Sequence, residues 1–118
     1  MREPKKLRAF DLADEVVMLA YEVTSDFPKE ELFGLTAQIR RAAVSVPSNI
    51  VEGCSRDSQN DFLRFLYIAF GSLRELNYQL NLSMRLGFLK TEMASKIEGR
   101  VAEAEKVLNG LIRSIRDK

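Results

Sequence analysis

The chain has 118 residues, 46% hydrophobic and 30% charged, which is enough for one domain with its own core and too little for two. It holds no histidine and one cysteine, Cys54, so it cannot assemble a conventional zinc site, a histidine-assisted nucleophile or an internal disulfide. We therefore expect a single domain over residues 1–118 that is not an enzyme and has no metal or cofactor, with frayed tails at about 1–8 and 116–118.

The beginning of the chain is basic but not apolar. Four of the first eight residues are Lys or Arg, yet no apolar signal core follows them. No stretch approaches the roughly 20 apolar residues of a membrane span. A lone cysteine fits a reducing compartment, so the sequence predicts a cytoplasmic protein without a membrane partner.

The net charge of +1 is unevenly distributed along the chain. Residues 9–33 carry seven acidic side chains and one lysine, whereas all six cations of residues 34–86 are arginines. Arginine pairs with carboxylates and phosphates through two parallel hydrogen bonds and tolerates partial burial. This choice favours specific contacts over general solubility.

Apolar residues recur with a period near 3.6 in the first half of the chain, which indicates two helices. The first is expected over about 11–25, with Asp11 as a candidate cap and an inner face of Leu12, Val16, Leu19, Ala20 and Val23. The second begins between Pro28 and Gly34 and ends near Gly53, with an inner face of Leu35, Ile39, Ala42, Ala43, Val46 and Ile50. Pro47 predicts a kink; the alternative is two shorter helices that meet at Val46 and Pro47.

The second half of the chain predicts two longer helices. One starts at Ser58, with Asp61 three residues on, and stops at Gly87; the other follows Thr91 and continues towards Ile115. Their inner faces alternate spacings of 4 and 3: Phe62, Leu66, Ala69, Leu73, Leu76 and Leu80, then Ile97, Val101, Ala104, Leu108, Leu111 and Ile115. The predicted fold is an all-α, antiparallel up-down four-helix bundle with a kinked second helix and a long third helix.

Residues 62–70 read FLRFLYIAF and are apolar on every side of the predicted third helix. A helix of a lone bundle needs one apolar stripe, so the excess predicts a homo-oligomer. We expect its interface to include Phe62, Leu63, Phe65, Tyr67 and Phe70. The alternatives are that the other helices of one subunit enclose the run, or that the run is a strand. Gly71 and Ser72 then leave little side-chain volume, which allows another helix to approach closely.

A polar stripe and four arginines are the other candidate features. One face of the second helix carries a polar stripe: Gln38, Ser45, Asn49 and Glu52, with Arg41 between them. The stripe contains no nucleophile paired with a base, so we interpret it as structural and hydrogen-bonding. The candidate nucleic-acid contacts are Arg40, Arg41, Arg56 and Arg64. The alternative for these arginines is ion pairing with Glu52, Asp57, Asp61 and Glu75. Cys54 is interpreted as a passive small residue.

The stretch from Gln38 to Gly53, QIRRAAVSVPSNIVEG, carries a resemblance to a known family. With Phe27-Pro28 before it and Arg56, Phe65-Leu66, Ala69, Gly71-Ser72 and Glu75-Leu76 after it, this stretch resembles the bacterial four-helix-bundle proteins also called ribosomal S23 or 23S rRNA intervening-sequence proteins. The likeness covers about residues 10–90. Val51 and Cys54 stand where the family more commonly has alanine and glycine.

The resemblance implies a small helical bundle that assembles into a homo-pentameric ring. The family is encoded in some cases within intervening sequences of ribosomal RNA genes. It is also similar to the accessory protein of diversity-generating retroelements, a basic ring that associates with nucleic acid and a reverse transcriptase. We thus expect a non-enzymatic oligomeric adaptor that contacts RNA, DNA or a nucleic-acid-processing protein. The alternative is a protein-binding scaffold ring with no nucleic-acid role.

Overall fold

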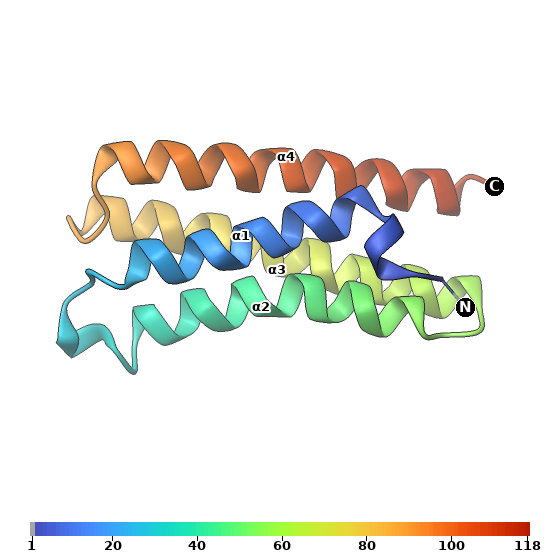
Figure 1. Cartoon of the computed structure of the whole chain (residues 1–118), viewed down its shortest axis with the longest axis horizontal. Helices are drawn as coiled ribbons and strands as arrows, with labels where there is room; N and C mark the ends of the chain where they lie inside the picture. Colours follow the sequence, from blue (N-terminus) through green and yellow to red (C-terminus); the bar gives the residue numbers. More distant parts are fainter. Residues whose placement is uncertain (1) are drawn as a thin grey trace.

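The computed structural model describes residues 2–118 and consists of four helices: α1 (Arg8–Thr24), α2 (Leu35–Cys54), α3 (Gln59–Arg85) and α4 (Thr91–Arg116). Short 3-10 turns precede α1 at Pro4–Lys6 and α2 at Lys29–Glu31. Each helix packs against its neighbours in the chain, and α1 packs against α4, which closes the bundle (Figure 1). The bundle measures 45 × 24 × 20 Å. These features confirm the predicted four-helix fold.

Both ends of α3 are set by the residues that the sequence indicated. The Ser58 side chain accepts a hydrogen bond from the Asp61 backbone N–H at 3.0 Å, which satisfies one unpaired donor of the first turn. At the other end Gly87 has a φ of +81°, and the Phe88 N–H bonds the Ser83 carbonyl across it at 2.9 Å. This left-handed glycine is the helix stop that was predicted.

The start of α1 differs from the prediction. The helix begins at Arg8, with Leu7 as the N-cap residue and no side-chain cap, so the assignment of Asp11 as the cap is wrong. Asp11 lies in the first turn instead, where a negative charge is favourable. The sequence did not indicate this start, because a 3-10 turn precedes α1 and its residues Pro4, Lys5 and Lys6 show no periodic apolar pattern.

The apolar seams meet in one core. All six predicted inner residues of α2 and all six of α3 are buried, which confirms both seams. Leu19 of α1 and Leu111 of α4 are only half-buried, so the predictions for these two residues are wrong; in α4, Ile112 is buried instead. A straight helix of 3.6 residues per turn drifts against a 3.5-residue repeat, and α4 corrects this drift with two successive spacings of 4 after Ala104.

Pro47 lies inside α2 without dividing it. The helix is continuous from Leu35 to Cys54, so the alternative of two shorter helices is wrong. The kink at Pro47 stays a prediction. The two helices α2 and α3 lie close together at Gly53, where an added Cβ would lie 3.0 Å from the Phe65 Cβ and 3.1 Å from the Phe62 Cδ1.

The first residues of the described chain lie against the turn between α2 and α3. The Arg2 N–H donates to the Cys54 carbonyl at 3.3 Å, and the Arg2 guanidinium donates to the Arg56 carbonyl at 3.1 Å. The same guanidinium lies 4.1 Å from the centre of the Phe62 ring. Two carbonyls just past the end of α2 are therefore satisfied by a segment about 50 residues earlier in the chain. Fraying of the tails stays a prediction.

Candidate association and nucleic-acid surfaces

The bundle covers more of the apolar run of α3 than expected. Phe62 is 3% exposed and belongs to the core, so it is not available to a partner and leaves the predicted interface set. Leu63, Phe65 and Phe70 are half-buried. The Phe65 ring is covered by two guanidinium groups, those of Arg56 at 4.9 Å and Arg64 at 4.4 Å from its centre. Tyr67 remains 47% exposed, and its neighbour Ile68 43%.

Exposed large apolar side chains are unevenly shared among the helices. Within residues 2–118, α4 contributes none, α1 contributes Met18 and Tyr21, and α2 and α3 together contribute Val44, Val51, Tyr67, Ile68 and Tyr78. Gly71, one turn after Tyr67, has open space where a Cβ would point. The expectation that Gly71 admits a close neighbour is thus not met inside the subunit. Leu32, Phe33 and Leu86, which lie outside the four helices, are also exposed. The five exposed apolar side chains of α2 and α3 are called the apolar face below.

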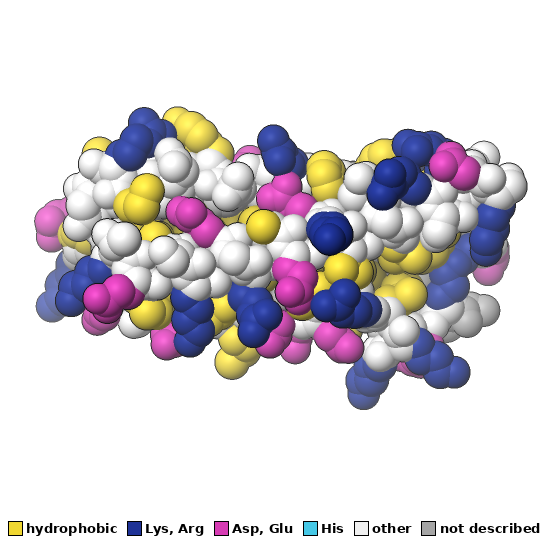
Figure 2. Space-filling view, turned by 90° about the horizontal axis from the view of Figure 1, so that it is seen from above, with side chains coloured by type: hydrophobic (Ala, Val, Ile, Leu, Met, Phe, Trp, Pro, Cys, Tyr) yellow, Lys and Arg dark blue, Asp and Glu magenta, His cyan; other side chains and the backbone are white. Residues whose placement is uncertain are grey.

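The α4 side has a different character. Figure 2 looks onto this side and shows basic and acidic side chains interspersed along the length of the molecule. Several of them pair between helices: Arg8 with Glu103 at 3.3 Å, Arg74 with Glu105 at 3.0 Å, and Arg100 with Glu15 at 3.9 Å. Surface pairs of this kind contribute about 0–1 kcal/mol each and suit a solvated face.

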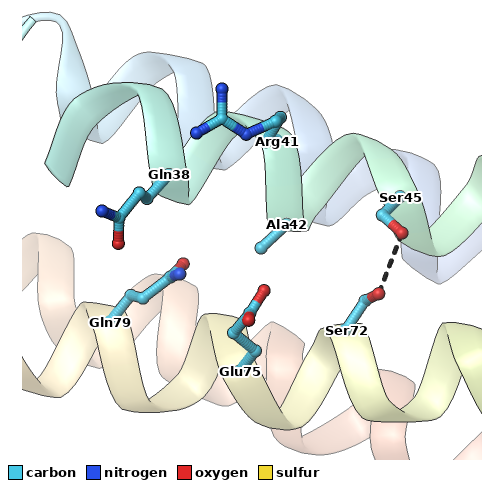
Figure 3. Close-up of a pocket in the computed structure, with 7 residues that line it drawn as sticks. All are labelled: Gln38, Arg41, Ala42, Ser45, Ser72, Glu75 and Gln79. Carbon is cyan, nitrogen blue, oxygen red and sulfur yellow. Dashed lines mark hydrogen bonds between the residues drawn. The ribbon is translucent and has the colours of Figure 1, made fainter. Parts of the chain in front are cut away.

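The polar stripe of α2 forms one wall of a groove against α3. The Ser45 and Ser72 hydroxyls are 2.9 Å apart (Figure 3). The Asn49 amide donates to the Ser45 carbonyl at 2.7 Å and to its hydroxyl at 3.0 Å. Glu52 instead pairs with Arg56. The groove has a volume of about 490 Å³ and is lined by Gln38, Arg41, Ala42, Ser45, Ser72, Glu75 and Gln79.

The α3 wall of this groove was missed by the sequence analysis. Ser72, Glu75 and Gln79 recur at spacings of 3 and 4, the same signal that revealed the stripe on α2. They stand next to the buried leucines of α3 in the chain, and the apolar spacing of those leucines does not reveal them. Gln79 is only 7% exposed, and its Oε1 is buried without a hydrogen-bond partner among residues 2–118.

The four candidate arginines separate into two groups. Arg40 donates to the Thr24 hydroxyl at 2.9 Å and stacks on Tyr21, towards α1, whereas Arg41 lines the groove with α3. Arg56 and Arg64 meet over Phe65. The part of α2 from Arg41 to its end at Cys54 is about 20 Å long, and Arg56 lies in the turn beyond it. The four do not form one patch within the subunit, and Arg56 and Arg64 pair with Glu52 and Asp61.

The end of the bundle that holds Arg56 and Arg64 is the basic end. The 3-10 turn with Lys5 and Lys6 packs against α2 there, and Gln59 bonds the Ile115 carbonyl at 3.0 Å, which brings the end of α4 to the same place (Figure 1). Residues 2–6, 52–64 and 113–118 hold eight basic and five acidic side chains; residues 22–34 and 85–93, at the opposite end, hold three basic and five acidic ones. The subunit is therefore polarised from +3 at one end to −2 at the other.

Other chemistry is sparse. Within the described residues, no three His, Cys, Asp or Glu side chains are grouped to hold a metal ion. None of the helices over residues 2–118 combines the length and hydropathy that crossing a bilayer requires. Cys54 is buried, and burial raises the pKa of its thiol while the nearby Arg2 charge lowers it less. A protonated, enclosed thiol agrees with a passive role.

Fold and surfaces together define a small four-helix bundle with an apolar face along α2 and α3 and a polarised charge distribution. The model of the 23S rRNA-intervening sequence protein family matches residues 5–110, and the chain belongs to this family.

A solved structure supports the same assignment. The crystal structure, at 1.70 Å, of a protein with unknown function from the S23 ribosomal protein family of Bacteroides thetaiotaomicron is 26% identical. It superposes with a TM-score of 0.80 over 89% of this chain and 98% of that one. Comparison with curated proteins gives no match. The family indicates no catalytic class.

Proposed function

We propose that the protein is a non-enzymatic homo-oligomeric adaptor, pentameric as the family resemblance implies, that contacts RNA or a nucleoprotein partner. Self-association uses the apolar face of α2 and α3, and RNA is held at the basic end. The observation that carries the RNA contact is the gathering of basic side chains at one end of the bundle.

The apolar face supports association because it carries five exposed large apolar side chains on two adjacent helices. Tyr67 and Ile68 are nearly half exposed, although most of the apolar run around them is covered by the subunit itself. Exposed apolar side chains that form a patch on one face mark association surfaces, whereas single scattered ones do not. The absence of a side chain at Gly71 allows a partner to come close to the α3 backbone.

The basic end supports RNA contact in two ways. Its guanidinium groups are already held over aromatic rings, so less side-chain entropy is lost when they bind phosphate. If subunits associate in parallel, the basic ends lie side by side and one weak site is repeated around the ring. The description of the family, which names the 23S rRNA intervening sequence, favours RNA as the partner.

A second candidate is a protein-binding scaffold with no nucleic-acid role. The observation that favours it is the pairing of Arg56 with Glu52 and of Arg64 with Asp61, which offsets part of the positive charge. The Arg56 side chain is 41% exposed and the Arg64 side chain 58%. Ion pairs this exposed are weak, so phosphate can replace the carboxylates. We therefore rank the scaffold below the RNA adaptor.

Association is tested by light scattering over a dilution series of the full chain. The proposal expects a mass that is a multiple of 13.4 kDa. A folded, soluble 13.4 kDa particle at every concentration would reject the oligomeric part of the proposal.

Nucleic-acid contact is tested by fluorescence anisotropy with structured RNA and with DNA across a range of salt. The proposal expects log affinity to fall linearly with log salt. The double variant Arg56→Glu, Arg64→Glu should abolish binding, while Arg100→Glu, on the α4 side, should reduce it little. Arg40→Glu with Arg41→Glu tests the other pair: loss of binding only in that variant would move the contact to the middle of α2. Salt-independent binding, or none, favours the scaffold.

A further inference from the structure

An open hollow lies on the surface of the first turns of α3, at the edge of the basic end. It has a volume of about 590 Å³ and is lined by Asn60, Leu63, Arg64, Tyr67 and Ile68. Most of its surface is apolar, and Arg64 is the one charged residue of its lining. The hollow therefore suits a ligand that combines a flat, weakly polar part with a negative charge.

Tyr67 provides an aromatic ring that the subunit leaves uncovered. It is 47% exposed, and among residues 2–118 no guanidinium and no second ring stacks on it. The two phenylalanine rings nearby differ in this respect, because Arg2 covers Phe62 at 4.1 Å and Arg64 covers Phe65 at 4.4 Å. Proteins that hold single-stranded nucleic acid stack its bases on exposed aromatic rings. A base inside a duplex is covered on both faces and does not reach such a ring.

Two guanidinium groups lie beside this ring. Arg64, one turn before Tyr67, lies 3.7 Å from the Asp61 carboxylate, which is too far for a hydrogen bond, so its edge stays free for an anion. Arg116, at the end of α4, donates to Asp117 at 3.0 Å. This hydrogen bond first, and the Tyr67 hydroxyl second, raise the pKa of Arg116, so its guanidinium lies next to the tyrosine. An exposed ring with cations beside it accommodates a base and its phosphate together.

We infer that this hollow binds an unpaired nucleotide of RNA, with the base stacked on Tyr67 and the phosphate held by Arg64 and Arg116. The inference rests on the proposed RNA contact and deepens it, because it names single-stranded RNA as the form that is bound. The Asn60 amide, in the same lining, offers a donor and an acceptor to the edge of the base. Tyr67 also belongs to the apolar face, and the other four side chains of that face remain for self-association.

The test is fluorescence anisotropy of the full chain with three RNA probes that carry the same number of phosphates. One is an unstructured uridine strand, the second is the same strand with its bases removed, and the third is a fully paired duplex. We expect the uridine strand to bind about 5- to 150-fold more tightly than the other two, the gain that base stacking provides. The duplex has the highest charge density, so attraction to phosphates alone would favour it instead.

The ratio of affinities for the uridine strand and the base-free strand is the readout for the variants, because a change in self-association alters both affinities alike. Tyr67→Leu removes the aromatic ring and should lower the ratio to within about twofold of one, whereas Tyr67→Phe keeps the ring and should keep the ratio. The matched control Tyr78→Leu, on the same helix and 60% exposed, should leave the ratio unchanged. Arg64→Gln should weaken binding of all three probes and reduce the salt slope by about 1.

The outcomes separate this inference from the proposed function. If the uridine strand binds no more tightly than the other probes, or if Tyr67→Leu keeps the ratio, the inference fails while the proposed RNA contact stands. A chain that binds none of the probes removes both. Tyr67→Leu that weakens self-association in light scattering and keeps the ratio shows that a second copy covers the ring, which also overturns the inference. Its Tm should stay within about 3 °C of the parent chain, because the ring lies outside the core.

Discussion

Two of the helical glycines, Gly53 and Gly71, differ in surroundings and so predict opposite effects of the same substitution. Replacing glycine by alanine in a helix stabilises it by about 0.5–1 kcal/mol through the backbone entropy of the unfolded chain. At Gly71 a new Cβ meets nothing within 4 Å, so the subunit should gain that full amount.

At Gly53 the same methyl group meets atoms that cannot easily move. It would lie 3.0 Å from the Phe65 Cβ, 3.1 Å from the Phe62 Cδ1 and 3.3 Å from the Phe62 carbonyl oxygen. Overpacking of this kind costs about 1–3 kcal/mol, which exceeds the gain in helix propensity. We expect Gly53→Ala to be less stable than the parent chain by about 0.5–2 kcal/mol, and less stable than Gly71→Ala by about 1–3 kcal/mol.

The assay is equilibrium unfolding in urea followed by circular dichroism, with thermal unfolding alongside. For a chain of this length 1 kcal/mol corresponds to about 3–6 °C in Tm. Each variant is measured at two protein concentrations, because association stabilises the folded state by mass action. A Gly53→Ala protein as stable as Gly71→Ala would refute the close contact between α2 and α3 at this position.

Three further predictions follow from local geometry. Ser58→Ala should cost about 1 kcal/mol of unfolding free energy in urea, since it removes the acceptor for the Asp61 N–H, and an unchanged midpoint would contradict the cap. Tyr67→Glu with Ile68→Glu should shift light scattering towards the 13.4 kDa subunit while Tm changes by less than about 3 °C, because both side chains are nearly half exposed and lie outside the core. Because burial raises the pKa of Cys54, its thiol stabilises the fold fully below the unfolded pKa of about 8.5 and progressively less as pH rises through the folded pKa. The stability of the parent chain relative to Cys54→Ala should therefore decline above about pH 8.5; a constant difference would contradict the raised pKa.

The helices and the core were predictable because their signals are local and periodic. The seam of α3 is a repeat of buried residues that can be found by counting, and Ser58 and Gly87 are end signals with a physical cause. The start of α1 was not predictable in this way, since Leu7 caps it without a polar side chain and a 3-10 turn precedes it. The exchange of Leu111 for Ile112 depends on how far α4 drifts around its axis, which spacing alone does not determine.

The surfaces were harder to predict because they depend on contacts between helices. The apolar run of α3 predicted more exposed apolar surface than the bundle leaves, and the covering of Phe65 by two arginines could not be deduced from their positions in the sequence. Arg40 and Arg41 are adjacent in the chain and nevertheless face different neighbours. Gln79 has no distinguishing signal of its own. Its burial follows from how closely α2 and α3 approach, and only the packed bundle fixes that distance.

The contacts of Arg2 have a practical consequence for anyone who handles this protein. The main-chain amide and the guanidinium of Arg2 hold the amino-terminal segment against the α2–α3 turn. A fusion tag joined directly before residue 2 would crowd these two hydrogen bonds. Trimming residues 2–7 would uncover the Phe62 ring and release two carbonyls to water. A tag after Lys118 emerges at the same end of the bundle, but it leaves the amino-terminal segment that makes these contacts unchanged.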